Sequence, residues 1–335
     1  MDKAVEIRAR QLDALTDGLH INQRYPLIHE VVLDPRRFHA AQDAVGQYLR
    51  ASLIASGVFP VCDDYEQMVQ LYASKLLRMP NVTPNGIVKP KLDTAAEFMV
   101  MHKRVAGLIA GIVLPGNKVV KMRLPLVLRL VDGTAPLEVV NRPRANNVMH
   151  SDFWTGSCCD LALLLPLLGD VEHTTIRFGE PVEAAENFLQ ELPSYRAGEA
   201  LYRGITHYPL QMRKGCIYFQ DIYCLHGTHR SGGGLRVSMD WTIQTVDYPE
   251  VELRHSSKAL TTDNHFDLET WFKVGHELMF LDTEKVAQTR ARYAAGAGAE
   301  KVALGAAVSG QTSDTSKVVN LIDAPGVLPL AREGT

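Results

Sequence analysis

The sequence predicts an α+β protein in which helices precede a core of antiparallel β-strands. Two patterns in its 335 residues support this prediction. Through much of residues 1–117, apolar side chains recur every three or four positions, as on the buried face of a helix. From 118 to 248 they alternate or form short runs between turn residues, which is typical of strands. We expect residues 249–335 to form a helical C-terminal extension that ends in a low-complexity tail.

The clearest helix start in the first part of the chain is Asp34-Pro35. An aspartate oxygen can cap the first free N–H groups of a helix, and proline fits the first helical position. Further helices are expected near 64–78 and 93–112, with an irregular link between them. Apolar residues recur at helical spacing after the cap, at Phe38, Ala41, Val45, Tyr48 and Leu49.

Strand patterns begin at Lys118. Residues 119–124 and 126–131 are mostly apolar, and the turn signal Asp132-Gly133 follows them. Residues 161–168 form an apolar run of the length of a strand buried on both faces. Short strands continue to about Val246. A long helix is expected over 267–292, and the chain becomes rich in glycine, alanine and serine after Ala294.

Composition argues against several classes of protein. A formal net charge of −3 with mixed signs gives no electrostatic footprint for nucleic acid, so we expect no nucleic-acid partner. No apolar run reaches the length that crosses a bilayer, and the charged N-terminus lacks the apolar centre of a signal peptide. The five cysteines, an odd number that includes Cys158-Cys159, predict reduced thiols and a cytoplasmic location.

A candidate metal site begins with His150-Ser151-Asp152. Residues two apart on an extended strand point to the same face, so His150 and Asp152 can aim an imidazole and a carboxylate at one point. His226, on a neighbouring strand, would add a second imidazole. Two histidines and one carboxylate on one side of a metal leave the opposite side open, and this arrangement suits non-haem Fe(II).

Two other histidine motifs compete with this assignment. His265-Phe266-Asp267 repeats the tripeptide, but Asp267 opens an apparently helical run, and Asn264 or Asp267 suits a helix N-cap. His229 could replace His226 as the distal ligand. It lies only seven residues before Arg236, in what we predict to be a glycine-rich turn, so His226 is favoured.

Arg236 and Ser238 predict a carboxylate-binding pair. They are two residues apart on an expected strand and therefore share a face. A guanidinium offers a fixed fork of N–H donors that matches a carboxylate, and the hydroxyl can add a further hydrogen bond.

Together these motifs resemble the Fe(II)/2-oxoglutarate-dependent oxygenases, and within them the phytanoyl-CoA hydroxylase-like group. The similarity covers about residues 118–248 and is carried by residues 149–154 (MHSDFW), 225–229 (LHGTH) and 235–240 (LRVSMD). It implies a double-stranded β-helix (jelly-roll, cupin-like) core with flanking helices. It also implies Fe(II) bound by His150, Asp152 and His226, with 2-oxoglutarate and O₂ as cosubstrates. Arg236 and Ser238 would hold the distal carboxylate of 2-oxoglutarate, and the chain would form a single catalytic domain.

The chain departs from the group's pattern in two places. Residues 174–181 (TTIRFGEP) stand where a Pro-Gly-Ser-His-like element is often found, and no asparagine follows His226. Both departures affect the prediction of the substrate and leave the prediction of the iron chemistry unchanged. Because the group's halogenases replace the carboxylate ligand with a small residue, Asp152 favours hydroxylation or another oxidation over halogenation.

A small polar metabolite is the expected substrate. Arg142, Arg144 and Asn146 share the strand phase of His150 and could bind a polar or anionic group, although a solvated strand end kinked by Pro143 is an equal alternative. Trp154 could wall the pocket or be a structural core residue. The sequence leaves the oligomeric state open.

Two other classes of function are alternatives to an oxygenase. A cupin-like metal-dependent isomerase or lyase would use the same barrel without 2-oxoglutarate, and Arg236 with Ser238 argues against it. A non-catalytic scaffold is disfavoured because every ligand position is occupied. Hydroxylation itself is not separable from desaturation, cyclisation or epoxidation by sequence.

Overall fold

The computed structural model describes residues 2–113, 119–123, 125–133, 148–155, 161–245 and 265–267. Its helices are α1 (Asp2–Thr16), α2 (Pro35–Ala55), α3 (Tyr65–Leu71), α4 (Ala73–Leu77) and α5 (Ala95–Val113), with short 3₁₀ helices η1 (Leu92–Thr94), η3 (Asp152–Thr155) and η4 (Tyr195–Leu201). Its strands are β1 (Ile21–Tyr25), β2 (Ile28–Val32), β3 (Ile87–Val88), β4 (Val119–Arg123), β5 (Val127–Asp132), β6 (Leu161–Gly169), β7 (Thr174–Ala184), β8 (Tyr202–His207), β9 (Cys216–Asp221), β10 (Leu225–Arg230), β11 (Leu235–Thr245) and β12 (His265–Asp267).

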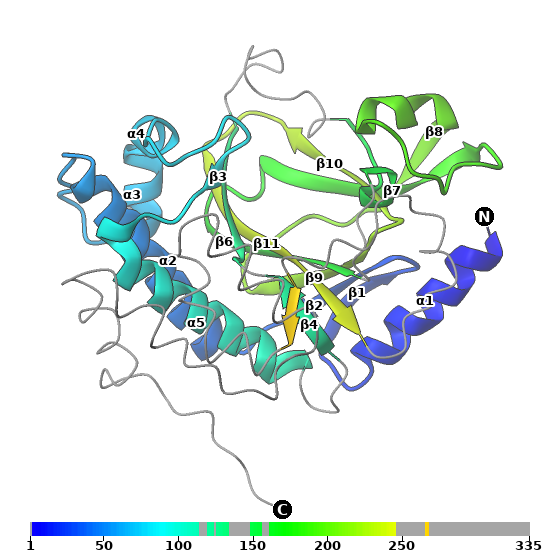
Figure 1. Ribbon diagram of the computed structural model, residues 1–335, viewed down its shortest axis with the longest axis horizontal. Coiled ribbons are helices and arrows are strands. Elements are labelled where there is room, and N and C mark those ends of the chain that lie inside the picture. Colours follow the sequence, from blue (N-terminus) through cyan, green and yellow to red (C-terminus); the bar gives the residue numbers. More distant parts are fainter. Residues whose placement is uncertain are drawn as a thin grey trace, which may run out of the picture.

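The strands form two antiparallel sheets (Figure 1). The larger sheet has the order β1-β2-β9-β6-β11-β4-β12, with β5 also paired to β11 and β3 paired to β5. The smaller sheet has the order β10-β7-β8, and an isolated bridge joins His150 to His226 of β10. Along the chain the path alternates between the sheets, from β5 to the His150 segment, β6, β7 with β8, β9, β10 and β11. This winding is that of a double-stranded β-helix, so the expected jelly-roll core is confirmed.

Helices cover the outer face of the larger sheet. Alternate residues of β11, from Leu235 to Ile243, point outward into a core that α2 and α5 complete. Because neighbouring residues of a strand face opposite sides, Arg236, Ser238 and Asp240 point inward, between the sheets. The outward core also contains Trp241, which is buried.

A second core lies between the two sheets. It joins Leu164 of β6 and Tyr218 of β9 to Phe178 of β7, with Phe153 and Ile222 beside them. The apolar run predicted as a buried strand is β6, in which eight of nine residues are buried. This packing fills part of the space between the sheets, and Asp240 of β11 lies directly opposite its member Leu164 in the sheet register.

The helices expected in the first part of the chain are confirmed. Asp34 caps α2, its side chain accepting a 2.9 Å hydrogen bond from the N–H of Arg37, and Pro35 is the first helical residue. The helical stretch expected near 64–78 is divided into α3 and α4, and Asp64 caps the first of these in the same way. The stretch expected near 93–112 is α5.

The sequence analysis missed the hairpin of β1 and β2, which extends the larger sheet beyond β9. The strand β2 shows no alternation because its polar residues are also buried. Glu30 accepts hydrogen bonds from Tyr218 and Arg213, and His29 lies 2.8 Å from the hydroxyl of Thr16. Hydrogen bonds offset the cost of burying polar groups, so a strand that contains them can be buried without an apolar pattern in its sequence.

One expectation about the later part of the chain is wrong. His229 and Arg230 belong to β10 and pair with β7, so the turn before Arg236 is shorter than expected. His265–Asp267 is strand β12, paired with β4, and the expected helix cap at Asp267 stays a prediction because the residues that follow lie outside the described part of the chain. The rest of the helix expected over 267–292, Cys158-Cys159 and the tail lie outside the described residues. In the described part of the chain, Cys62, Cys216 and Cys224 are free thiols.

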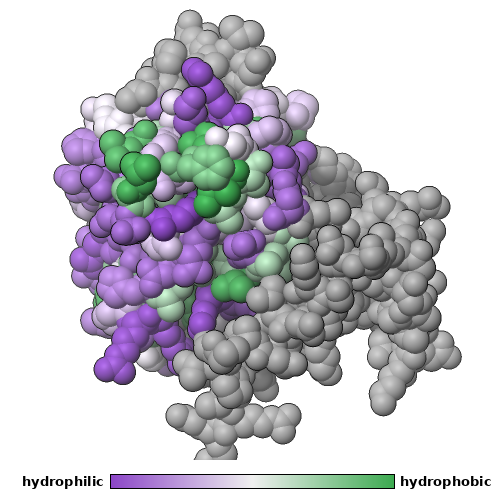
Figure 2. Space-filling model, turned by 90° about the vertical axis from the view of Figure 1, so that its left-hand side faces the viewer, coloured by the Kyte–Doolittle hydropathy of each residue, from purple (hydrophilic) through white to green (hydrophobic). Residues whose placement is uncertain are grey.

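Four large apolar side chains in and between α2 and α3 are exposed to solvent, namely Ile54, Phe59, Val61 and Leu71. Figure 2 views the molecule from the side on which α3 and α4 lie and shows apolar residues gathered there among polar ones. None of the helices that the structure describes is long and apolar enough to span a bilayer.

Candidate metal and cosubstrate site

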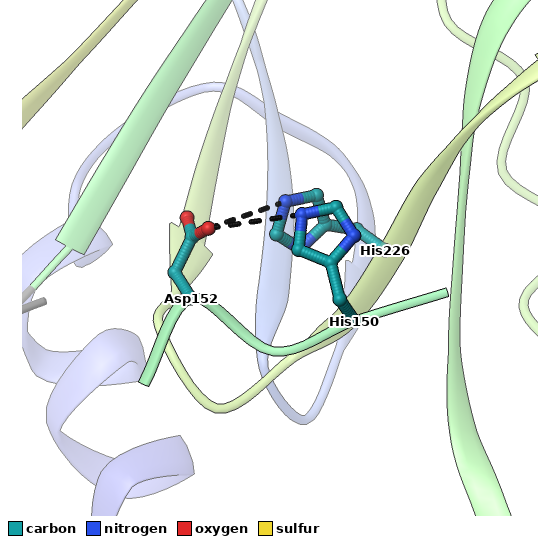
Figure 3. Close-up of side chains that lie close together, drawn as sticks. All are labelled: His150, Asp152 and His226. Atoms are coloured by element: carbon teal, nitrogen blue, oxygen red, sulfur yellow. Dashed lines mark ion pairs between the residues drawn. The ribbon is translucent and has the colours of Figure 1, made fainter. Parts of the chain in front are cut away.

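The three predicted metal ligands come together between the sheets (Figure 3). His150 and His226 lie opposite each other, and each donates its backbone N–H to the other's carbonyl oxygen at 2.9 Å. The oxygen Oδ1 of Asp152 lies 3.9 Å from Nε2 of His150 and 3.8 Å from Nε2 of His226. One ligand atom from each residue falls within 4.8 Å of the other two, a spacing that a single metal ion can bring together.

The backbone that carries His150 and Asp152 differs from the extended strand that the sequence predicted. His150 has strand pairing, but Asp152 already begins the 3₁₀ helix η3, so the two do not share one extended segment. The N–H of Phe153 and the hydroxyl of Ser151 both donate to the carbonyl oxygen of Ile222, at 3.3 and 2.8 Å. These two bonds, one on each side of Asp152, fix its backbone and direct its carboxylate to the histidines.

Hydrogen bonds at the far side of each imidazole direct Nε2 toward Asp152. Nδ1 of His150 lies 2.7 Å from the carbonyl oxygen of Val148, to which it can donate a proton. Nδ1 of His226 lies 3.2 Å from the carbonyl oxygen of Cys224, to which it can donate a proton, and 2.6 Å from the amide nitrogen of Gln220, a donor whose amide must turn its oxygen to Nδ1 when that proton is present. A proton held on Nδ1 leaves the Nε2 lone pair free, as metal-binding histidines require.

The site favours neutral imidazole at His150. Burial lowers the pKa of His150 to about 4, and the nearby His226 lowers it further, while Asp152 opposes the shift. Metal ions bind deprotonated ligands, so this histidine needs no loss of a proton near neutral pH. With Asp152 as the carboxylate, the donor set of two nitrogens and one oxygen fits Fe(II) and leaves one side of the metal without a protein ligand.

His229 does not join this group. It lies three residues after His226 on β10, and strand alternation turns it to the opposite face of the smaller sheet. There its Nε2 lies 2.7 Å from the guanidinium of Arg177. Of the two histidines considered as the distal ligand, His226 is the one beside His150 and Asp152.

Arg236 and Ser238 lie together on the inner face of β11, as expected. Both side chains are buried, with 1% and 0% of their surface exposed. Nη1 of Arg236 donates to the carbonyl oxygen of Thr174 at 2.9 Å. Its Nε and the Ser238 hydroxyl make no hydrogen bond to any residue that the structure describes.

Burial disfavours the charged form of Arg236. It lowers the pKa of the guanidinium to about 9, and the nearby Arg129 adds to this effect. A buried guanidinium with an unsatisfied N–H and a buried hydroxyl without a hydrogen bond are costly unless an anion completes them. The pair therefore fits the distal carboxylate of a bound dicarboxylate such as 2-oxoglutarate.

An ion pair that the sequence analysis missed lies beside this pair. Arg129 of β5 is directly opposite Ser238 in the sheet register, and its guanidinium binds Asp240 through two hydrogen bonds of 3.0 and 2.9 Å. The charges of Asp240 and, more weakly, Asp152 help to raise the pKa of Arg129 against the effect of burial. A charged residue within an apolar strand was the available signal for Arg129, and Asp240 shares the phase of Ser238.

Tyr195 is a second residue that the sequence did not indicate. Its hydroxyl donates to Oδ1 of Asp152 at 3.2 Å, and its ring centre lies 4.2 Å from that of His150. It comes from η4, in the segment between β7 and β8. No local sequence pattern connects this segment with residues 43 positions earlier, so only the fold reveals the contact.

Of the residues expected to bind substrate, the structure describes Trp154. Trp154 is fully buried, packs against Phe188 and donates its indole N–H to the Phe188 carbonyl oxygen at 2.9 Å. Its position fits the structural alternative. Arg142, Arg144 and Asn146 lie outside the described residues.

Comparisons with known proteins found similarity among solved structures alone. No protein-family model and no curated protein sequence matches the chain. AviO1 from Streptomyces viridochromogenes Tue57 is 14% identical, with a TM-score of 0.38, over 67% of this chain and 93% of its own. The non-haem α-ketoglutarate-dependent epimerase SnoN from nogalamycin biosynthesis is 14% identical, with a TM-score of 0.34, over 71% and 83%.

An N-substituted L-amino acid dioxygenase from Burkholderia ambifaria AMMD is 13% identical, with a TM-score of 0.35, over 71% of this chain and 91% of its own. The epimerase belongs by its description to the class of enzyme that the sequence motifs resemble.

Proposed function

We propose that the protein is an Fe(II)/2-oxoglutarate-dependent oxygenase that acts on a small polar metabolite. The observation that carries the proposal is the pairing of two features between the two sheets. One is the cluster of His150, Asp152 and His226, and the other is the buried pair Arg236 and Ser238, in which the guanidinium Nε and the hydroxyl have no hydrogen bond to any described residue. A metal ion explains why the three ligands converge. A dicarboxylate that binds this metal and reaches to β11 explains the buried pair as well.

Each residue has a separate task in this proposal. His150, Asp152 and His226 would hold Fe(II), and Arg236 with Ser238 would bind the distal carboxylate of 2-oxoglutarate. When bound, iron and 2-oxoglutarate supply the activation of O₂, with succinate and CO₂ as products. The buried surroundings of Arg236 exclude water and strengthen its attraction for the carboxylate.

A polar substrate is supported by the charged residues near the metal cluster. Arg129 and Asp240 face inward from the larger sheet and are only partly buried, with 22% and 32% of their side chains exposed. Asp152 fills the third ligand position, so we propose oxygen insertion or another oxidation in place of halogen transfer. A chlorinated product from the unaltered protein in chloride buffer would contradict that part of the proposal.

The test is consumption of 2-oxoglutarate. The protein with Fe(II), 2-oxoglutarate and ascorbate would be screened against a panel of polar metabolites, with succinate release and O₂ uptake as readouts. We expect slow succinate release without substrate and faster release with the right one, both lost in an Asp152→Ala variant. A protein that binds Fe(II) but neither binds nor consumes 2-oxoglutarate would instead favour the metal-dependent isomerase or lyase alternative.

A further inference from the structure

The segment of residues 185–201 between β7 and β8, which we call the cap, is closed at its base. The N–H of Ala185 donates to the carbonyl oxygen of Leu201 at 2.8 Å, so the cap leaves and rejoins the smaller sheet at one point. Near its end the side chain of Ser194 accepts a hydrogen bond from the N–H of Ala197 and starts η4. A loop with joined ends can hold a defined shape on the barrel.

The cap is fastened to the metal-binding segment through Trp154. The indole N–H of Trp154 donates to the carbonyl oxygen of Phe188, and its own carbonyl oxygen accepts the N–H of Leu192 at 2.6 Å. Gly198 lies directly against the indole ring, since a Cβ added there would be 2.1 Å from two ring carbons. Trp154 lies two residues after Asp152, so the cap and this ligand are held as one unit.

From the cap, Tyr195 reaches the metal cluster. Its phenol donates to Oδ1 of Asp152, the same oxygen that faces Nε2 of both histidines. An ionised carboxylate oxygen has two lone pairs, so Oδ1 can bind a metal with one and accept the phenol with the other. The contact of the Tyr195 ring with His150 holds the phenol in this position.

We propose that Tyr195 is a positioning residue that keeps Asp152 bound to the metal through one oxygen. The role of the cap is to place Tyr195 beside Asp152. The inference rests on the proposed metal site. With its rotation fixed, the carboxylate keeps its second oxygen off the metal. The side of the metal opposite the protein ligands then stays open for the cosubstrate.

The test compares Tyr195→Phe with Tyr202→Phe in the full chain. The first variant removes the hydroxyl at Asp152 and keeps the ring against His150. The second is a matched control, because the Tyr202 hydroxyl donates to the backbone carbonyl of Met149 at 3.2 Å and not to a ligand side chain. Co(II), added without O₂, serves as the probe, and its absorption spectrum reports coordination independently of turnover.

For Tyr195→Phe we expect Co(II) affinity about tenfold weaker and an altered cobalt spectrum, at an unchanged melting temperature. Tyr202→Phe should bind Co(II) as the unaltered protein does. Gly198→Ala, which pushes the cap from Trp154, should weaken Co(II) binding and also lower the melting temperature. Equal affinity and equal spectra for Tyr195→Phe and the unaltered protein would overturn the inference.

The outcome is separable from that of the proposed function. If the unaltered protein binds Co(II) with the expected dependence on Tyr195 but releases no succinate, the inference stands and the oxygenase proposal fails. If the unaltered protein binds no Co(II), both fail.

Discussion

The guanidinium of Arg8 and the carboxylate of Asp221, 213 positions apart in the sequence, form a 2.7 Å ion pair with 1% and 0% of their side chains exposed. Asp221 also accepts the N–H of Tyr223 at 2.8 Å, and the Arg8 guanidinium lies 4.2 Å from the centre of the Tyr223 ring. The turn between β9 and β10 is thus fastened to α1. The same turn carries the Ile222 carbonyl that holds both sides of Asp152.

Arg8→Met should therefore destabilise the protein strongly, because it leaves the Asp221 carboxylate buried without its cation. Removing one partner of a buried pair costs about 3–5 kcal/mol of unfolding free energy. Chemical denaturation of the metal-free protein would measure the loss. Arg10→Gln is the control on the same helix, since Arg10 is exposed and forms an ion pair with the exposed Glu6. A loss below about 1 kcal/mol for Arg8→Met would show that the pair has the weight of a surface contact.

His226→Ala should abolish Fe(II) binding and succinate release while leaving the fold intact. The variant removes one of the three ligands that converge between the sheets. His229→Ala is the control, because His229 faces away on the same strand and should leave Fe(II) affinity unchanged. Isothermal titration with Fe(II) under anaerobic conditions checks both variants. Normal metal binding by His226→Ala would refute the assignment of the distal ligand.

Arg236→Lys should weaken 2-oxoglutarate binding at least tenfold, or by about 1.4 kcal/mol or more, since an ammonium cannot reproduce the guanidinium fork. Ser238→Ala should cost less, on the order of 1 kcal/mol for one hydrogen bond. Neither change should alter Fe(II) affinity, because neither residue is a ligand. Titration of 2-oxoglutarate into the anaerobic Fe(II) protein measures both effects. Unaltered binding by both variants would remove the second support of the oxygenase proposal.

The metal-free protein should lose stability as the pH falls from about 6.5 toward 4. Burial lowers the pKa of His102 to about 4, although the carbonyl oxygens of Phe98 and Leu126 oppose the shift. The unfolded chain takes up this proton near pH 6.5 and the folded chain only near pH 4. The free energy of unfolding therefore falls across that window, by about 1.4 kcal/mol per unit of pKa difference.

His102→Gln should make the loss shallower, because glutamine does not titrate. It should not remove it, because burial lowers the pKa of His29 to about 4 as well. Unfolding by urea at a series of pH values from 4 to 8 would measure the two slopes. Equal slopes for the variant and the unaltered protein would contradict the buried neutral state of His102.

The sequence predicted those parts of the site that repeat with strand period or stand at a fixed spacing. His150, Asp152, His226, Arg236 and Ser238 were found this way. The 3₁₀ turn at Asp152 escaped prediction because hydrogen bonds to Ile222, a residue far along the chain, impose it. Such contacts are properties of the folded chain and leave no local pattern.

The same reason explains what was missed in the fold. The strand β2 carries buried Glu30 and His29, so its apolar pattern is broken by residues whose partners lie on α1 and β9. Tyr195 reaches Asp152 from a loop whose shape depends on Trp154. Helix caps such as Asp34, by contrast, act within a few residues and were predicted correctly.

The pairing of β2 with β9 has a consequence for how the protein is made. Val31 lies opposite Ile217, and Arg8 meets Asp221 at the end of that strand. Strand β9, with which the N-terminal hairpin pairs, is synthesised only after almost two thirds of the chain. Contacts between such distant segments form slowly. The histidines cannot face each other before His226 has emerged from the ribosome, so the metal site can be loaded only at a late stage of folding.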